Sequence, residues 1–80
     1  MAVSAFILVN IKRGGEGTVV NEIRKKPGVI YADELYGGFD IIIKIKKDNM
    51  EEIQNFLINY LRKIEDIEKT KTLITIEDGS

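Results

Sequence analysis

The first segment of the chain constrains the fold most, because both of its alternating sets of side chains are apolar. Residues 2–11 read AVSAFILVNI. One set consists of Val3, Ala5, Ile7, Val9 and Ile11, and the other contains Phe6 and Leu8. A short run that is apolar in both sets is typical of a buried strand, and such a strand needs cover on both faces. We therefore expect it at the centre of a sheet.

The next segments predict a helix and a hairpin. A glycine-rich loop, KRGGEG, leads into TVVNEIRKK (18–26), which has apolar residues at helical spacing and ends before Pro27 and Gly28. VIYADELY (29–36) and FDIIIKIKK (39–47) have strand character, and the two glycines between them favour a turn. Phe39 and the isoleucines at 41, 43 and 45 share one predicted face, and Asp40, Ile42, Lys44 and Lys46 share the other.

A second helix and a last strand follow. Asp48 or Asn49 can cap the helix, and Glu51 or Glu52 can complete a capping box. Its apolar stripe consists of Ile53, Phe56, Leu57, Tyr60, Leu61 and Ile64, of which we expect Ile53, Leu57, Leu61 and Ile64 to be the main anchors. KTKTLITIE (69–77) is rich in good strand formers, and DGS follows as a tail.

The order strand, helix, strand, strand, helix, strand predicts an α+β fold of the ferredoxin-like βαββαβ type. Its four-stranded antiparallel sheet would carry both helices on one face, with the first and third strands in the centre. Phe6, Leu8 and Ile42 would then lie on the other face and need a second cover. We expect a homodimer with its sheets face to face, of the dimeric α/β barrel type, built from one domain over residues 1–80.

Composition narrows the function. The chain has no cysteine and no histidine, so we expect no catalytic residue, metal or cofactor. Its net charge of −1 disfavours direct contact with nucleic acid, and its first residues lack the features of a leader or a membrane span. KRGGEG lacks the lysine and hydroxyl ending of a phosphate loop, which favours a flexible connection. These features indicate a cytoplasmic protein.

The short stretch YGGFD raises a question about its aspartate. Two glycines account for a hairpin turn, but they do not account for Asp40, because aspartate is a poor strand residue. A carboxylate at an interface needs a partner. Lys44 on the same predicted face is one candidate, and the ammonium group of a ligand is another.

The stretch PGVIYADELYGGFDIIIKI resembles the second and third strands of the ligand-binding domain of the Lrp/AsnC family of transcription regulators, also called the RAM domain. The matching positions are Pro27, Val29, Gly37, Phe39 and Asp40. The closing IEKTKTLITI resembles the family's last strand, with Thr70 and Thr72 in its Thr-x-Thr element. The similarity extends from AFILVNI to TLITI.

The resemblance implies a stand-alone sensing domain without the family's helix-turn-helix. An amino-acid effector would bind between dimers, with its carboxylate near Gly37 and Gly38 and its ammonium group near Asp40. Tyr36, Thr70 and Thr72 would line the pocket, although Tyr36 replaces the family's usual small hydroxyl residue. Dimers would assemble into tetramers or octamers, and mixed assembly with a DNA-binding paralogue would modulate transcription.

Two other functions compete with this interpretation. A small dimeric α+β barrel enzyme would have only Asp40, Tyr31, Tyr36 and lysines as catalytic candidates. An RNA recognition motif has the same topology, but its third strand needs stacking aromatics where FDIIIKIKK has isoleucines. The sequence therefore favours a sensing and assembly module over both.

Overall fold

The computed structural model describes residues 2–12 and 14–76, in which the predicted order of elements is confirmed. The elements are β1 (Val3–Ile11), α1 (Glu16–Arg24), β2 (Val29–Glu34), β3 (Ile41–Lys47), α2 (Met50–Asn59), the short 3-10 helix η1 (Leu61–Lys63) and β4 (Ile67–Ile76). Their bounds differ from the predicted ones by a few residues. The predicted strand end at Glu77 and the DGS tail lie outside the described residues.

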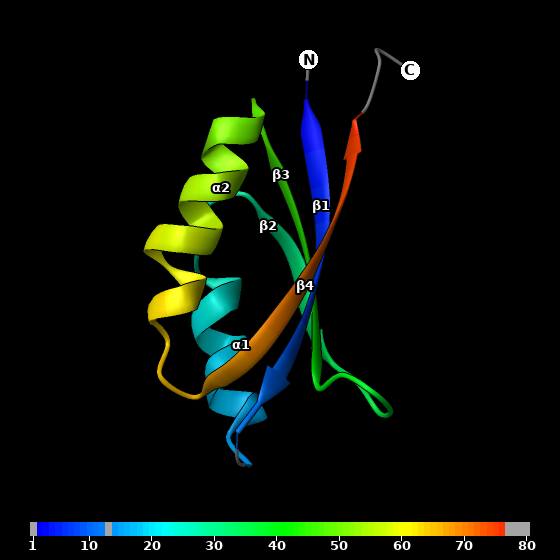
Figure 1. The fold of residues 1–80 in the computed structure, drawn as a ribbon, viewed down its shortest axis with the longest axis vertical. Helices are drawn as coiled ribbons and strands as arrows, with labels where there is room; N and C mark the ends of the chain where they lie inside the picture. The colour runs from blue at the N-terminus through cyan, green and yellow to red at the C-terminus, as the bar shows by residue number, and fades with distance from the viewer. Residues whose placement is uncertain (1, 13, 77–80) are drawn as a thin grey trace.

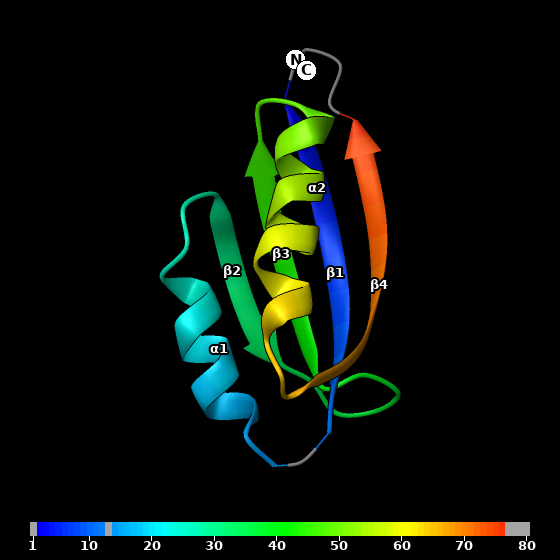
Figure 2. The ribbon, with the colours of Figure 1, turned by 60° about the vertical axis from the view of Figure 1, so that its left-hand side comes forward.

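The four strands form one antiparallel sheet in the order β2-β3-β1-β4. Figures 1 and 2 show both helices packed on the same face of this sheet. β1 and β3, the two most apolar strands, are therefore central, as the split βαβ topology predicts. We call the sheet face that carries no helix the open face.

The core lies between the helices and the sheet. It is built mainly from the alternate residues of β1 and β3 that point toward the helices, among which Ile7, Val9, Ile41, Ile43 and Ile45 are fully buried. α1 contributes Val19, Val20 and Ile23, and the second helical segment contributes Ile53, Phe56 and Leu61. One side of each central strand is thus fully covered, which leaves the open face as the side still in need of cover.

The second helical segment differs from its prediction in length and in its anchors. α2 ends at Asn59, and the chain tightens into η1 at Leu61. Ile53, Phe56 and Leu61 are buried, whereas Leu57 and Ile64 are only partly buried against the core. The prediction that Leu57 and Ile64 are main anchors was therefore wrong. On α2 the buried residue is Phe56 in place of Leu57, and Ile64 follows η1, where the chain has left the α-helical pitch.

The start of α2 is capped by Asn49, whose side-chain oxygen accepts a hydrogen bond from the Glu52 backbone N–H at 2.9 Å. Replacing Asn49 with Ala removes this bond and should lower the free energy of unfolding by about 1 kcal/mol. Chemical denaturation of the two proteins measures the change. Asn55→Ala, an exposed change within α2, is the control and should leave stability nearly unaltered. Equal losses in the two variants would contradict the capping role.

Candidate functional site

The β2–β3 connection, residues 35–40, is the loop that carries the predicted ligand site. Figure 1 shows it projecting from the sheet on the side away from the helices, and Figure 2 shows it beyond the lower end of β1. The Asn10 side-chain amide donates a hydrogen bond to the Gly38 carbonyl at 3.0 Å. The loop is therefore attached to β1 as well as to the two strands that it joins.

Asp40 makes the main contacts between this loop and β1. Its Oδ2 accepts a hydrogen bond from the Ile11 backbone N–H at 2.7 Å, and its own N–H donates to the Val9 carbonyl at 2.8 Å. Its carbonyl accepts from the Leu35 N–H at 2.8 Å and so closes the loop. At the end of the β1–β3 pairing, the Asp40 carboxylate thus accepts the Ile11 N–H bond that a backbone carbonyl would otherwise accept.

This geometry changes two expectations about Asp40. The residue precedes β3, which begins at Ile41, so it is not a strand residue. The protein partner of its carboxylate is a backbone N–H, whereas the Lys44 ammonium lies 5.3 Å from the centre of the Phe6 ring. Among the described residues no hydrogen bond reaches Oδ1 of Asp40. One carboxylate oxygen is thus fixed by the fold, and the other remains as an acceptor.

The two glycines and Tyr36 form the open part of the loop. Gly37 has φ of +127°, a conformation that favours glycine. A Cβ added to Gly37 or Gly38 would meet no atom within 4 Å, so the turn is not packed against the rest of the chain. Tyr36 is fully exposed and lines a groove of about 330 Å³ with Glu34 and Leu35.

Asn10 is a loop-contacting residue that the sequence analysis did not select. Its Oδ1 is buried and has no hydrogen-bond partner among the residues that the structure describes. The available signal was its position, because Asn10 is a polar residue near the end of an otherwise apolar strand. Together with Asp40 it fixes the loop across the end of β1.

Thr70 and Thr72 lie elsewhere on the chain. They pair with Val9 and Ile7, which point toward the helices, so both threonines are on the helix side of β4. Thr70 lines a separate groove of about 340 Å³ with Arg62, Ile67, Glu68 and Lys69. A single copy therefore brings Tyr36, Gly37, Gly38 and Asp40 together but does not add the two threonines to them.

The helix side offers little acid–base chemistry. Burial raises the pKa of the Tyr60 hydroxyl, and the nearby Glu22 carboxylate raises it further, so this phenol stays protonated at neutral pH. The Lys26 ammonium lies 4.5 Å from the centre of the Tyr60 ring.

Within residues 2–12 and 14–76 there is no cluster of three or more metal-ligating side chains and no helix able to cross a membrane.

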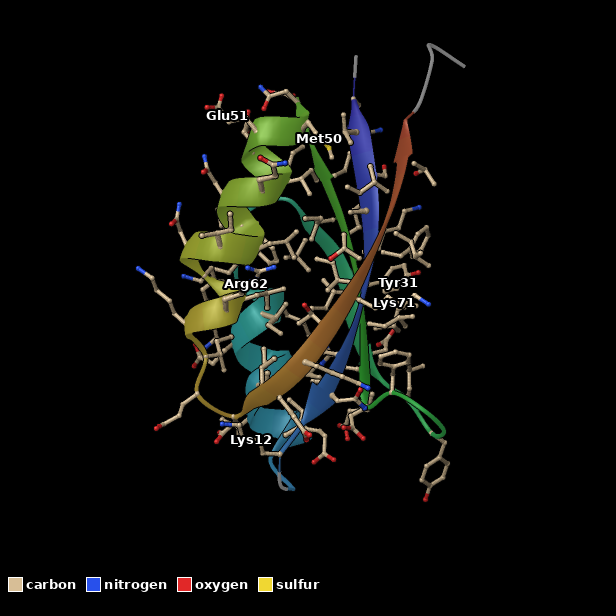
Figure 3. The ribbon with its side chains drawn as sticks, viewed as in Figure 1. Lys12, Tyr31, Met50, Glu51, Arg62 and Lys71 are labelled. Carbon is tan, nitrogen blue, oxygen red and sulfur yellow. The ribbon has the colours of Figure 1, made fainter. Side chains whose placement is uncertain are left out.

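The open face is the second candidate surface, and the strand register orders its side chains into two rows across the sheet. From β2 to β4 the tyrosine row consists of Tyr31, Lys44, Phe6 and Leu73. The aspartate row beside it consists of Asp33, Ile42, Leu8 and Lys71. Figure 3 shows Tyr31 and Lys71 on the side of the sheet away from the helices. Phe6, Leu8 and Ile42 are thus on the face where the sequence placed them.

Comparison with known proteins gives consistent matches. Residues 4–78 match the Lrp/AsnC ligand binding domain. The transcriptional regulator FL11 of Pyrococcus furiosus is 36% identical over 73 residues, which are 91% of this chain and 48% of FL11. The chain therefore spans about half the length of this relative.

Solved structures agree with this assignment. The hypothetical protein PHS023 of Pyrococcus horikoshii is 32% identical, with a TM-score of 0.92 over 96% of this chain and 93% of that protein. A transcriptional regulator of Neisseria meningitidis, solved as an L-Met complex, shares the fold at 19% identity, with a TM-score of 0.80 over 98% of this chain and 52% of that regulator. The match over nearly all of the chain shows that it belongs to the Lrp/AsnC ligand-binding domain family.

Proposed function

We propose that this domain senses a small molecule, namely an amino acid or a close relative of one, and acts in transcription regulation through its assembly with other copies and with DNA-binding paralogues. The observation that carries the proposal is the carboxylate of Asp40 beside the open two-glycine turn. Family membership supports a ligand-binding role. The L-Met complex of the Neisseria regulator supports a free amino acid as a ligand that this fold can hold.

The chemistry of the loop suits the two charges of a free amino acid. The Ile11 N–H holds one oxygen of Asp40 at 2.7 Å and so orients the carboxylate, and the other oxygen can accept from an ammonium group. The backbone N–H groups of Gly37 and Gly38 are candidates for the ligand's carboxylate, because glycine lets an anion approach the backbone closely. Tyr36 would cover the ligand from the tip of the loop.

The proposed site is completed by another copy of the chain. Thr70 and Thr72 are on the helix side of β4 and do not join the loop of their own chain. In the proposed assembly, the threonines of a neighbouring copy line the pocket. Ligand binding and higher assembly would then be coupled, since the same contact creates the pocket and joins the dimers into a tetramer or octamer.

Replacing Asp40 with Asn tests the ligand role. Asparagine can still accept the Ile11 N–H bond, so the loop and the fold should persist, whereas the lost charge should weaken amino-acid binding about tenfold or more. Calorimetric titration of both proteins with each of the twenty amino acids measures the change.

Two further variants separate the roles of Asp40. Asp48→Asn removes an exposed carboxylate beyond β3 and should leave binding unchanged. Asp40→Ala loses the bond to Ile11 as well, and should lower both binding and thermal stability. If Asp40→Asn matches wild type in affinity for an amino acid that binds, Asp40 is a structural residue only. If none of the twenty amino acids binds wild type, the proposed effector class is wrong.

A further inference from the structure

Asn10 contacts the β2–β3 loop through only one end of its side-chain amide. Its Nδ2 donates to the Gly38 carbonyl at 3.0 Å, whereas its Oδ1 is buried and has no partner among the described residues. A carbonyl oxygen can only accept a hydrogen bond, so the amide must turn its nitrogen toward Gly38. A buried acceptor without a donor is costly, and folded proteins keep few of them. The amide is thus oriented by its contact with the loop, at the expense of its own oxygen.

We propose that Asn10 is a positioning residue of the ligand site, which holds the two-glycine turn so that its donors face a ligand. The inference rests on the proposed function and deepens it, because it names the side chain that prepares the turn for the carboxylate of the amino acid. Asn10 does not touch the ligand. It acts through the peptide unit that joins Gly38 to Phe39.

The geometry of this peptide unit carries the argument. In a trans peptide the C=O and N–H bonds point in opposite directions. The Gly38 carbonyl is directed at the Asn10 side chain, so the Phe39 N–H is directed away from β1. A site that another copy of the chain completes needs donors on this outward side. The Phe39 N–H therefore joins the N–H groups of Gly37 and Gly38 as a donor to the ligand.

The backbone N–H groups of the turn are free to bind an anion. Those of residues 36–39 make no hydrogen bond within the described part of the chain. In that part, the bond from Asn10 is also the only hydrogen bond that reaches these residues. Successive backbone N–H groups are common donors to a bound anion, whereas a carbonyl on the same side would repel a carboxylate. Asn10 holds the Gly38 carbonyl away from that side.

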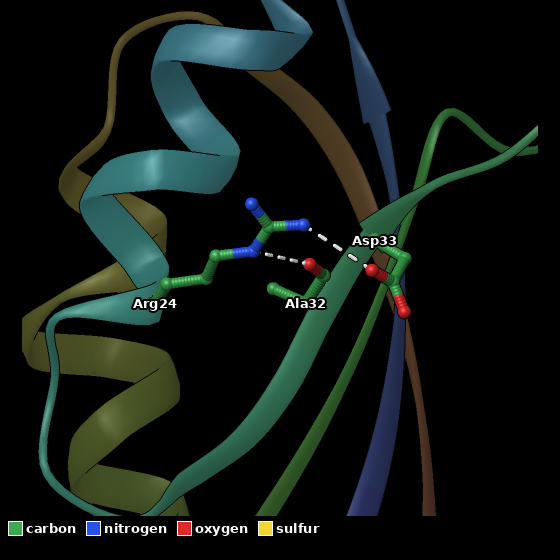
Figure 4. A network of polar contacts seen from close by, with 3 residues as sticks. All are labelled: Arg24, Ala32 and Asp33. Atoms are coloured by element: carbon green, nitrogen blue, oxygen red, sulfur yellow. Dashed lines mark hydrogen bonds and ion pairs between the residues drawn. The ribbon is translucent and has the colours of Figure 1, made fainter.

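The two strands that carry the loop are anchored by other contacts. Figure 4 shows Arg24 reaching from α1 to β2, where its Nε donates to the Ala32 carbonyl at 2.8 Å and its Nη2 lies 3.2 Å from Oδ1 of Asp33. On the other strand, the Asp40 N–H donates to a carbonyl of β1 at 2.8 Å. Neither contact reaches the turn, so the orientation of the turn depends on Asn10.

Replacing Asn10 with Leu tests this role, because leucine has a similar size but no N–H to donate. The affinity for an amino acid that binds wild type should fall about tenfold. The melting temperature should not fall, because the variant removes a buried acceptor that lacks a partner and leaves the Gly38 carbonyl to water. Calorimetric titration with each of the twenty amino acids and thermal unfolding measure the two quantities.

The end of the ligand that loses affinity identifies the mechanism. Asn10→Leu should weaken binding of the free amino acid far more than binding of its carboxamide derivative, in which a neutral amide replaces the carboxylate. Asp40→Asn should weaken binding of both compounds, because both keep the ammonium group. Asn10→Gln keeps an amide donor and should regain part of the affinity. Asn21→Leu makes the same change at an exposed position on α1 and should leave both affinities unaltered.

Three outcomes would contradict the inference. An equal loss of affinity for the amino acid and its carboxamide, or a loss that accompanies a lower melting temperature, would make Asn10 a structural residue only. Unchanged affinity of Asn10→Leu for an amino acid that binds wild type would overturn the inference and leave the proposed function standing. If none of the twenty amino acids binds wild type, the proposed effector class and this inference are both wrong.

Discussion

Phe6→Lys should convert the dimer into a folded monomer. Phe6 lies in the tyrosine row at the middle of the open face, between Lys44 on β3 and Leu73 on β4. In the proposed dimer this position is covered, so the variant would bury a second lysine beside Lys44 in the middle of the interface. Losing the buried ring and burying a charge without a partner act in the same direction, and the dissociation constant should rise by a factor of about 100 or more.

The fold should survive this change, because Phe6 points away from the core and is only half-buried in one copy. A lysine there can extend its ammonium group into water in the monomer. Ile58→Lys is the matched control, since Ile58 is 53% exposed on α2, on the helix side of the molecule. Analytical ultracentrifugation and circular dichroism follow mass and fold together. A Phe6→Lys protein with wild-type mass would show that another surface forms the assembly.

The topology could be predicted from sequence because it follows from local patterns that agree with one another. The alternation in β1 and β3, the break at Pro27 and Gly28, and the cap at Asn49 each predict one element, and only one common fold uses that order. The register of the sheet then follows from the pleat, since a slip of one residue would turn the buried isoleucines of β3 outward. Phe6, Leu8 and Ile42 on the open face follow from the same argument.

The surroundings of Asp40 could not be predicted in this way. Its contact with the Ile11 N–H depends on where β1 and β3 cease to pair, which is a property of the folded backbone and not of the residue pattern. The partly buried state of Ile64 is a similar case, because Ile64 follows η1, where the chain has left the α-helical pitch of α2. The local sequence thus determines whether a segment forms a helix or a strand, whereas the residue at which that element ends depends on tertiary contacts.

The arrangement of charged residues on the open face could not be predicted from the sequence for a different reason. A net charge of −1 averages over the whole chain, and it conceals the position of single residues. Lys71 and Asp33 are 38 residues apart in the numbering, and they share a row only because β1 and β3 lie between their strands. The order of charged residues along a row can be determined only when the strand order and the register are both known.

Leu61→Ala should strongly destabilise the fold. Leu61 opens η1, is fully buried, and lies in the core with Ile53 and Phe56. Removing a buried leucine side chain typically lowers the free energy of unfolding by about 2 to 5 kcal/mol, through lost apolar burial and the cavity left behind. A small domain has only about 5 to 15 kcal/mol in total, so the melting temperature should fall by many degrees.

Leu57→Ala is the informative comparison for this truncation. It deletes the same atoms from a side chain that is only partly buried against the core, so its loss should be clearly smaller. Urea unfolding at a fixed protein concentration gives both values, and a fixed concentration matters because assembly adds to the apparent stability. If Leu57→Ala costs as much as Leu61→Ala, the ideal helical stripe drawn from the sequence describes the helical layer better than an α2 that ends at Asn59. If Leu61→Ala costs more, Leu61 is a main anchor of the helical layer and Leu57 is not, as their burial indicates.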